Sequence, residues 1–302
     1  MKNLQETIAV IKKSSRDYPK ILLEIHNAPK QLFVRGSLPK DHSLNFAIVG
    51  TRAASDYGRT LAFKIAQELA ELGFNIVSGL ALGVDTESHL GALEGKNRAG
   101  ARAGNTIAVL GSSIDDNSIY PSANFKLAKK IISSGGAVIS EYEPGTKSEI
   151  WFFPERNRII SGLSRGVLVV EAPEKSGALI TARLALEQNR DVFAIPGSIF
   201  SKNSLGANAL IKSGAKMVTS VDDILEELNL ADLKEKKGSD EKELLAEEEK
   251  IIFDIIEKEP IHIDKICHAS KMPASQALSV VSMLEIKGLI KNIGGGKFVK
   301  IK

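Results

Sequence analysis

The stretch that decides the fold is residues 153–197, FPERNRIISGLSRGVLVVEAPEKSGALITARLALEQNRDVFAIPG. Two arginines, Arg156 and Arg158, stand at the start of an apolar helix, and a buried-looking strand follows it. A turn at Ser176 and Gly177 then opens another helix. Cations and small polar residues therefore gather where strands pass into helices, which is where an open α/β sheet binds phosphate-bearing ligands. The stretch lacks a nucleophile with a base, so it indicates binding rather than cleavage.

Seven short apolar segments with helical patterns between them predict the fold class. Strands that are apolar throughout, separated by amphipathic helices ending in glycine, are typical of a parallel sheet covered on both faces. We therefore predict a Rossmann-like, doubly wound, mostly parallel α/β sheet. The expected strands are Phe46–Val49, Asn75–Ser78, Thr106–Leu110, Ala137–Ser140, Val167–Val170, Val192–Ile195 and Lys216–Thr219.

The chain divides into four segments by composition and pattern. Residues 1–43 form a short N-terminal extension, expected as a short helix and then an irregular stretch with three prolines. Residues 44–230 form the Rossmann-like domain, and residues 231–243 form a charged linker. Residues 244–302 read as three helices and a two-stranded ribbon, the pattern of a small winged-helix domain.

Size, charge and composition exclude several classes of protein. A chain of 302 residues suits one large domain and a smaller one. The single cysteine, Cys267, excludes an intramolecular disulfide, and the N-terminus has no secretory signal or membrane span. We therefore expect a soluble cytoplasmic protein with no membrane association. The net charge of +3 is too small to argue nucleic-acid binding, so any electrostatic footprint must be local.

Motifs for catalysis, cofactors and metals are missing from the sequence. The first strand is followed by GTRAASDYG rather than the dinucleotide fingerprint G-x-G-x-x-G, and no GK[ST] phosphate loop exists. The five histidines include no H-x-x-x-H zinc pair. Asp85 and His89 share a helical face, but helix capping by Asp85 and local packing of His89 are the better reading. We predict no catalytic residues, no metal and no cofactor.

Four blocks recur in one order, and their combination resembles a known family. They are AIVGTR at 47–52, SGLALGVDTESH at 78–89, IYPSAN at 119–124 and the stretch at 153–197. The chain resembles the DNA processing protein A family, also called Smf, from about residue 18 to residue 223. The resemblance implies that, of the N-terminal helical domain that many members carry, this sequence contains chiefly the part at Tyr18–Gly36.

The resemblance implies a function and partners. The expected protein binds single-stranded DNA, protects incoming DNA in natural transformation and helps to load RecA recombinase in place of single-strand-binding protein. It is expected to form a homodimer through its Rossmann-like domain. Binding should be largely sequence-independent, with phosphates held by arginines and backbone amides.

The DNA-binding residues that we predict follow strands or open helices. Glycine lets the backbone approach a ligand, hydroxyls and amides donate hydrogen bonds, and arginine suits phosphate. Simple capping is an open alternative for the small polar residues. The candidates are Gly50, Thr51, Arg52, Ser78, Gly79, Lys147, Arg156, Asn157, Arg158, Ser176, Gly177, Thr181 and Asn208.

Two further features bear on the site. Arg156 and Arg158 are two residues apart and cannot share one helical face, so one should meet phosphate and the other a carboxylate, Glu141 or Glu171. Among the aromatic residues at 151–153, one could face solvent as a stacking platform for a base. The basic segment 94–105 is expected to be a flexible surface loop that could contact nucleic acid.

Two rival functions remain open. A nucleotide-binding, phosphoribohydrolase-like enzyme shares this sheet architecture, but its P-G-G-x-G-T motif and catalytic glutamate are missing from residues 194–208. A nucleotide-binding regulator that reads promoter DNA would need a basic recognition helix. The segment at 274–287 is poor in arginine and lysine, which disfavours sequence-specific readout.

Overall fold

A computed structural model of the chain describes residues 7–39, 43–234, 245–256 and 259–300. Contacts within the chain divide it into two compact units, Met1–Ala231 and Asp232–Lys302, and each is described by itself. The structure confirms a Rossmann-like, mostly parallel sheet in the larger unit and a winged helix in the smaller one.

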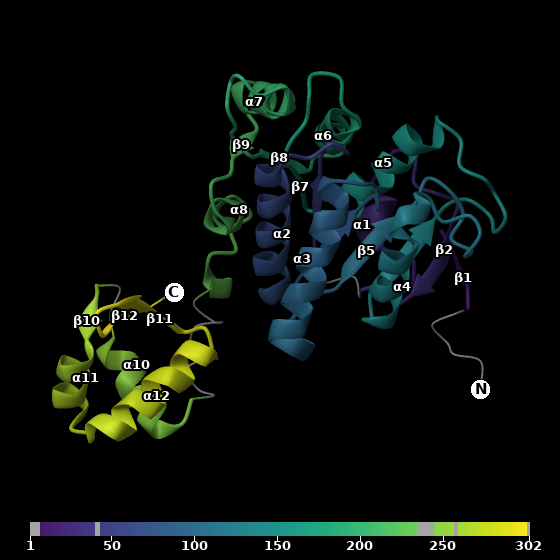
Figure 1. Cartoon of the computed structure of the whole chain (residues 1–302). Coiled ribbons are helices and arrows are strands. Elements are labelled where there is room, and N and C mark those ends of the chain that lie inside the picture. The colour runs from purple at the N-terminus through teal and green to yellow at the C-terminus, as the bar shows by residue number, and fades with distance from the viewer. Residues whose placement is uncertain (1–6, 40–42, 235–244, 257–258, 301–302) are drawn as a thin grey trace. The chain divides into compact units, whose positions relative to one another are not determined.

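The described part of the larger unit is built on a sheet of nine strands in the order β1-β2-β6-β5-β4-β3-β7-β8-β9 (Figure 1). Strands β3 to β9 pair in parallel, whereas β2 is antiparallel to both β1 and β6. The strands are β1 (Ala9–Lys12), β2 (Gln31–Gly36), β3 (Leu44–Val49), β4 (Phe74–Ser78), β5 (Thr106–Val109), β6 (Ala137–Ser140), β7 (Gly166–Val169), β8 (Asp191–Ala194) and β9 (Lys216–Met217).

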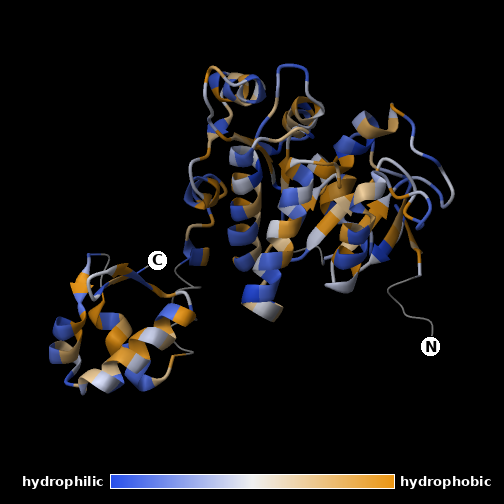
Figure 2. Ribbon diagram, viewed as in Figure 1, coloured by the Kyte–Doolittle hydropathy of each residue, from blue (hydrophilic) through white to orange (hydrophobic). Residues whose placement is uncertain are grey.

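Helices cover both faces of this sheet, because both faces of each central strand are apolar. Along β3, Ala47 and Val49 belong to a core shared with α1, α5 and α6, whereas Phe46 points to the other face, where α2 and α3 lie side by side (Figure 1). Hydrophobic residues fill the layer between helices and sheet (Figure 2). The helices are α1 (Lys20–Leu23), α2 (Asp56–Glu71), α3 (Val84–Ala99), α4 (Phe125–Ser133), α5 (Phe152–Gly162), α6 (Gly177–Glu187), α7 (Leu205–Lys212) and α8 (Val221–Glu227).

Helix α2 shows how local sequence places an element against the sheet. Ser55 has extended backbone geometry and caps the helix by accepting a hydrogen bond from the Gly58 N–H at 3.2 Å. Ala62, Ile65 and Leu69 then recur at helical spacing and are fully buried or nearly so. The first turn of α2 is therefore fixed directly behind the end of β3, on the edge of the sheet where the predicted site lies.

The seven expected strands are all present, but the expectation for residues 1–40 is wrong. A short helix does occur at α1, yet β1 and β2 join the sheet on either side of it in the chain. The buried run in β2 pairs with β6, and β1 is a short edge strand with mostly exposed residues. An exposed four-residue edge strand has little apolar alternation to mark it in the sequence.

The basic segment 94–105 is also not the loop that we expected. Its first six residues continue α3 to Ala99, and a 3₁₀ turn at Gly100–Arg102 follows. Arg98 pairs with Glu94 one turn earlier, at 3.1 Å, which supports the helix. Because α3 runs from the carboxyl edge of the sheet to the amino edge, this basic segment lies at the edge opposite the predicted site.

The described part of the smaller unit has the three helices that its sequence predicts, and a third, short strand joins the predicted two-stranded ribbon. Helix α10 (Glu247–Ile255), α11 (Ile263–Ser270) and α12 (Ala274–Ile286) enclose a core with the strands β10 (Ile261–His262), β11 (Ile290–Gly294) and β12 (Lys297–Lys300). The predicted linker 231–243 lies mostly outside the described residues. No helix in the described ranges of either unit is long and apolar enough to cross a membrane.

Candidate functional site

The site lies where the chain changes direction across the sheet. After β3 the chain adds β4, β5 and β6 on one side, and then β7, β8 and β9 on the other. The Thr51 N–H donates to the Glu171 carbonyl at 2.7 Å and joins the carboxyl ends of β3 and β7. Open α/β sheets bind ligands at such a switch point. The predicted residues Gly50, Thr51 and Arg52 are therefore at the ligand-binding edge.

Gly50 and Glu171 make this junction tight. A side chain at Gly50 would come within 2.5 Å of Val84 and 2.9 Å of the Glu171 carbonyl, so glycine is required for packing there. The buried Glu171 carboxylate accepts from the Ser55 N–H at 2.9 Å and the Ser55 hydroxyl at 2.5 Å. A carboxylate at the amino end of α2 stabilises the helix dipole, and it fixes the loop that carries Arg52.

Arg52 is the exposed cation of the site. Its guanidinium carbon lies 5.4 Å from the centre of the Phe153 ring, and the Tyr120 and Phe153 rings lie 5.5 Å apart. In the described part of the chain Arg52 has no ion-pair partner. A guanidinium stacked on a ring keeps its donors available to a ligand. Arg52 is thus positioned to bind an anion.

Arg156 lies beneath this cation, and it is buried. It is 5% exposed, and one guanidinium nitrogen donates to the carbonyls of Gly79, at 2.8 Å, and Val109. Its Nε donates to the Asn157 side chain at 3.3 Å. These contacts connect α5 to the ends of β4 and β5, so Arg156 holds the site together, and little of its guanidinium faces a ligand. A side chain at Gly79 would come within 2.6 Å of Arg156 and 2.7 Å of Asp85, which explains the glycine.

Asp85 and His89 share the buried environment of Arg156. The Asp85 carboxylate accepts from the N–H groups of Gly79, at 3.1 Å, and Ala81, at 3.3 Å, so it fastens the loop before α3. The predicted helix capping by Asp85 is wrong, because Gly83 is the N-cap and Asp85 lies within the first turn of α3. Burial lowers the pKa of Arg156 to about 10, against the opposing effect of Asp85. Burial and then Arg156 lower the pKa of His89 to about 3. His89 is therefore neutral, and the buried cation is Arg156.

The hydrogen bonds of His89 identify its tautomer. The Thr106 hydroxyl donates to the Ile76 carbonyl at 2.8 Å, so it accepts from His89 Nδ1 at 2.7 Å. His89 Nε2 then carries the lone pair, and it is buried with no hydrogen-bond partner in the described part of the chain. A neutral histidine in this position serves packing, in agreement with the sequence interpretation.

The loop between β4 and α3 carries local strain. Leu80 is fully buried with φ of +59°, a left-handed conformation that costs energy for a non-glycine residue. The Asn124 side chain donates to the carbonyls of Leu80, at 2.8 Å, and Ala81, at 3.2 Å, and holds the strained turn. The IYPSAN block at 119–124 therefore stabilises the loop between β4 and α3 through Asn124.

The structure separates Arg158 from Arg156 as predicted. Arg158 forms an ion pair with Glu141 at 2.7 Å, and both side chains are less than one-fifth exposed. Of the two carboxylates considered from the sequence, Glu141 is the partner of Arg158, whereas Glu171 accepts hydrogen bonds from Ser55. A DNA contact by Arg158 stays a prediction, and its main observed contact is internal.

The loop between β6 and α5 carries further exposed candidates. Lys147 is exposed and forms no ion pair within the described ranges. Trp151 is 60% exposed and meets Phe152 edge to face at 6.1 Å, whereas Phe152 stacks on Tyr142 at 3.9 Å. Trp151 is therefore the aromatic residue of the three with most surface available for stacking.

The other predicted residues mainly fix the backbone around the site. The Ser78 hydroxyl donates to Ile48, the Asn157 amide to Gly177, and the Thr181 hydroxyl to Gly177. Ser176 caps α6 through the Ala178 N–H, and the Asn208 amide pairs with Gly197 in both directions. The capping alternative thus accounts for Ser176, and direct DNA contacts by these residues stay predictions.

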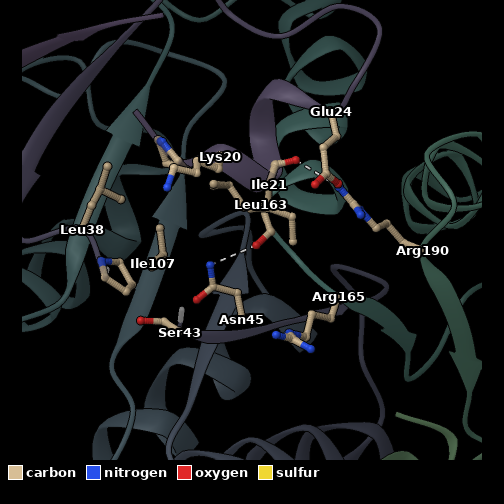
Figure 3. A pocket seen from close by; sticks show the side chains of 12 residues that line it. Lys20, Ile21, Glu24, Leu38, Ser43, Asn45, Ile107, Leu163, Arg165 and Arg190 are labelled. Carbon is tan, nitrogen blue, oxygen red and sulfur yellow. Dashed lines mark hydrogen bonds and ion pairs between the residues drawn. The ribbon is translucent and has the colours of Figure 1, made fainter. Parts of the chain in front are cut away.

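A cavity lies at the opposite edge of the sheet. It encloses about 360 Å³ between α1, the start of β3 and the turns before β7 and β8 (Figure 3). Arg190 is held there by the Ile21 carbonyl and Glu24, and Asn45 by the Leu163 carbonyl. Since ligands of open α/β sheets bind at carboxyl ends, we assign the site to the switch point and not to this cavity.

The arrangement at the carboxyl edge can bind anions. An exposed arginine, a buried arginine, an exposed lysine and aromatic rings surround the strand ends, and they suit phosphate and stacked bases. Within residues 7–39, 43–234, 245–256 and 259–300, no group of three or more histidine, cysteine, aspartate or glutamate side chains could hold a metal ion.

Known proteins match both units of the chain. A family model described as DNA recombination-mediator protein A matches residues 9–229, and one for the DprA winged helix domain matches residues 236–296. The chain is 38% identical to Protein Smf of Escherichia coli, over 97% of this chain and 77% of that protein. It is 47% identical to DNA processing protein DprA of Streptococcus pneumoniae, over 70% of this chain and 71% of that protein.

Two solved structures share the fold. The X-ray structure of DNA processing protein A from Streptococcus pneumoniae superposes with a TM-score of 0.66 at 42% identity, over 74% of this chain and 75% of that one. A structure of DNA processing protein A from Helicobacter pylori is described for its single-stranded DNA binding mode. It superposes with a TM-score of 0.63 at 30% identity, over 74% of this chain and 95% of that one. The chain belongs to the DNA processing protein A family.

Proposed function

We propose that the protein binds single-stranded DNA at the carboxyl edge of its sheet and does so without reading sequence. The observation that carries the proposal is the exposed Arg52 guanidinium, which rests on Phe153 at the switch point. Arg52 offers paired donors to a phosphate, and the exposed Trp151 offers a ring to a base. The Helicobacter pylori relative, whose structure is described for single-stranded DNA binding, supports the same ligand.

The residues at this edge divide into contacts and supports. Arg52 and Lys147 are exposed cations and would meet phosphates, and Trp151 would stack on a base. Arg156 adds a buried positive charge below them and fixes α5 against Gly79. The order of strands places these groups along one edge, so they would follow a single strand of DNA.

The wider role follows from the family. We propose that the protein protects single-stranded DNA in natural transformation and helps to load RecA recombinase in place of single-strand-binding protein. The description of the family as a recombination mediator supports this role. We further propose that the protein works in the cytoplasm as a homodimer and as a binding protein rather than an enzyme. Measuring the mass in solution by light scattering tests the homodimer directly.

Binding of fluorescent oligonucleotides tests the proposed ligand. Single-stranded oligothymidylate and a mixed-sequence single strand should bind with similar affinity, and both should bind tighter than a duplex of the same length. Arg52→Ala should weaken single-strand binding, whereas Arg183→Ala, an exposed arginine on α6 paired with Glu187, should not. Equal affinity of wild type and Arg52→Ala would refute the site.

A further inference from the structure

We propose that Phe200 is a second aromatic contact for the DNA, and that it stacks on a nucleobase of the strand held at Arg52. This inference rests on the proposed function and extends the same site to the end of β8. The observation behind it is an exposed ring on a firmly held loop that is hydrogen-bonded to the loop of Arg52.

The exposure of this ring is extreme for an apolar side chain. Phe200 is 92% exposed, and its neighbour Ile199 is 74% exposed. Single exposed apolar residues are common on protein surfaces, but a ring presented this fully has both faces free for a planar partner. No pattern in the sequence marks this exposure, because serine and lysine residues surround Phe200 as in an ordinary loop.

The loop that carries Phe200 is held at both ends. The Asn208 side chain donates to the Gly197 carbonyl at 2.9 Å and accepts from the Gly197 N–H at 3.1 Å. The Tyr57 hydroxyl donates to the Pro196 carbonyl at 2.9 Å. Within the loop, the Phe200 N–H donates to the Ser198 hydroxyl at 3.2 Å. These bonds limit the conformational entropy that stacking would cost.

The same loop is bonded to the segment that bears Arg52. The Asn203 side chain donates to the carbonyl of Ala53, the residue after Arg52, at 2.8 Å. The Asn203 carbonyl accepts from the Ala172 N–H at 2.7 Å, which joins the loop to the end of β7 as well. The Phe200 loop is therefore part of the switch-point edge and not a separate surface.

The order of strands gives the spacing along this edge. Arg52 follows β3 and Phe200 follows β8, and only β7 lies between these two strands. Neighbouring strands are about 4.8 Å apart, so the two strand ends are separated by about 10 Å. Trp151 follows β6, on the other side of β3. Aromatic residues would then flank the Arg52 phosphate contact on both sides.

A nucleobase fits this position better than an apolar protein surface does. Lys202, two residues on, is exposed and adds positive charge beside the ring, which suits a phosphate next to a stacked base. Base stacking on an aromatic side chain tolerates any base, in keeping with binding that does not read sequence.

The test compares Phe200→Ala with Phe200→Trp, Phe200→Leu and the neighbouring Ile199→Ala in the full chain. Affinity is measured for oligothymidylates of about 4 to 16 nucleotides at several salt concentrations. We expect Phe200→Ala to lose between about 5-fold and 100-fold for the longer oligonucleotides, with the slope of log K against log salt unchanged. Tryptophan should retain affinity, leucine should not, and Ile199→Ala should resemble wild type.

Three outcomes overturn the inference. Equal affinities of Phe200→Ala and Ile199→Ala would show that the ring makes no specific contact. Full retention by Phe200→Leu would show that apolar area rather than stacking matters. A change of solution mass in Phe200→Ala would assign the residue to a protein interface. Failure of the proposed function is distinct, because Arg52→Ala would then also bind as wild type.

Discussion

The carboxyl edge of the sheet and helix α12 of the winged helix are both candidate nucleic-acid surfaces, and they differ in their charges. At the sheet edge, exposed Arg52 rests on Phe153 above the buried Arg156. On α12, the exposed side chains include Leu278, Met283 and Ile286, the last of them 80% exposed. Phosphate binding needs cations, and apolar side chains on a recognition helix do not supply them.

The difference shows that the presence of a fold associated with DNA binding does not by itself identify the surface that binds DNA. The winged helix is a familiar DNA-reading motif, yet its lysine nearest to α12, Lys287, pairs with Glu249 at 2.7 Å. The Rossmann-like sheet is used for many ligands, yet its switch point carries Arg52 and Lys147, which have no ion-pair partner among the residues that the structure describes. The charges of particular residues therefore assign the site.

The largest effect should come from Arg156. If the carboxyl edge depends on this buried cation, Arg156→Leu leaves Asp85 buried without its opposite charge and frees the carbonyls of Gly79 and Val109. We expect a loss of about 3–5 kcal/mol in the free energy of unfolding of the larger unit. Fluorescence of Trp151, the single tryptophan, reports denaturation of that unit. Arg52→Ala is the control and should cost less than about 1 kcal/mol.

A small effect of Arg156→Leu, similar to that of Arg52→Ala, would contradict the structural role assigned to Arg156. A loss below about 1 kcal/mol for Arg156→Leu would mean that the buried arginine does not organise the edge. In that case the burial of Arg156 would not stabilise the larger unit, and the assignment of Arg156 as a structural support of the site would be wrong.

The second effect is acid destabilisation through His89. Its pKa is about 3 in the folded protein and about 6.5 when unfolded, so between these values the unfolded chain binds the extra proton. Stability from this group is therefore complete above about pH 6.5 and is lost as pH falls towards 3, by on the order of 4 kcal/mol. His89→Asn, which keeps a polar group near Thr106, should flatten this limb of the stability profile.

Parallel stability profiles for wild type and His89→Asn between pH 3 and 7 would contradict that assignment. Burial also raises the pKa of Asp85, and the comparison of the two proteins removes the contribution of this shared group. Circular dichroism during denaturant titration at each pH gives the measurement.

The third effect separates the two arginines of α5. Arg158→Ala removes the ion pair with Glu141 and leaves a mostly buried carboxylate, which should cost about 1–3 kcal/mol of stability. The slope of DNA affinity against salt should change little, because this cation is already neutralised within the fold. A large change of slope with normal stability would make Arg158 a phosphate contact instead.

Much of the fold and part of the candidate site could be predicted from the sequence, for identifiable physical reasons. Buried parallel strands are continuous apolar runs, so all seven were found, and the two-residue spacing of Arg156 and Arg158 required different roles for them. Strands β1 and β2 were both missed. β1 is short and mostly exposed, and β2 lies between Pro29 and Pro39, which favoured an irregular stretch. The burial of Arg156, the strain at Leu80 and the exposure of Phe200 depend on segments distant in sequence, and no local pattern encodes them.

The smallest effect should come from the winged helix. If the carboxyl edge carries the DNA contact, a chain ending after Leu230 should keep most of its affinity for single strands. The expected loss is below tenfold, or about 1.4 kcal/mol. A larger loss, with the fold of the remaining unit shown to be intact by circular dichroism, would move the principal contact to residues 244–302 and reverse the comparison.

The most direct test of the central claim is the salt dependence of single-strand binding in Arg52→Ala, compared with Lys291→Ala on strand β11 of the winged helix. Each phosphate neutralised on a single strand contributes about −0.7 to the slope of log K against log salt. The account predicts that Arg52→Ala flattens the slope by about 0.7, equally for unrelated sequences, and that Lys291→Ala leaves it unchanged. An unchanged slope and affinity in folded Arg52→Ala, with a flattened slope in Lys291→Ala, would contradict it.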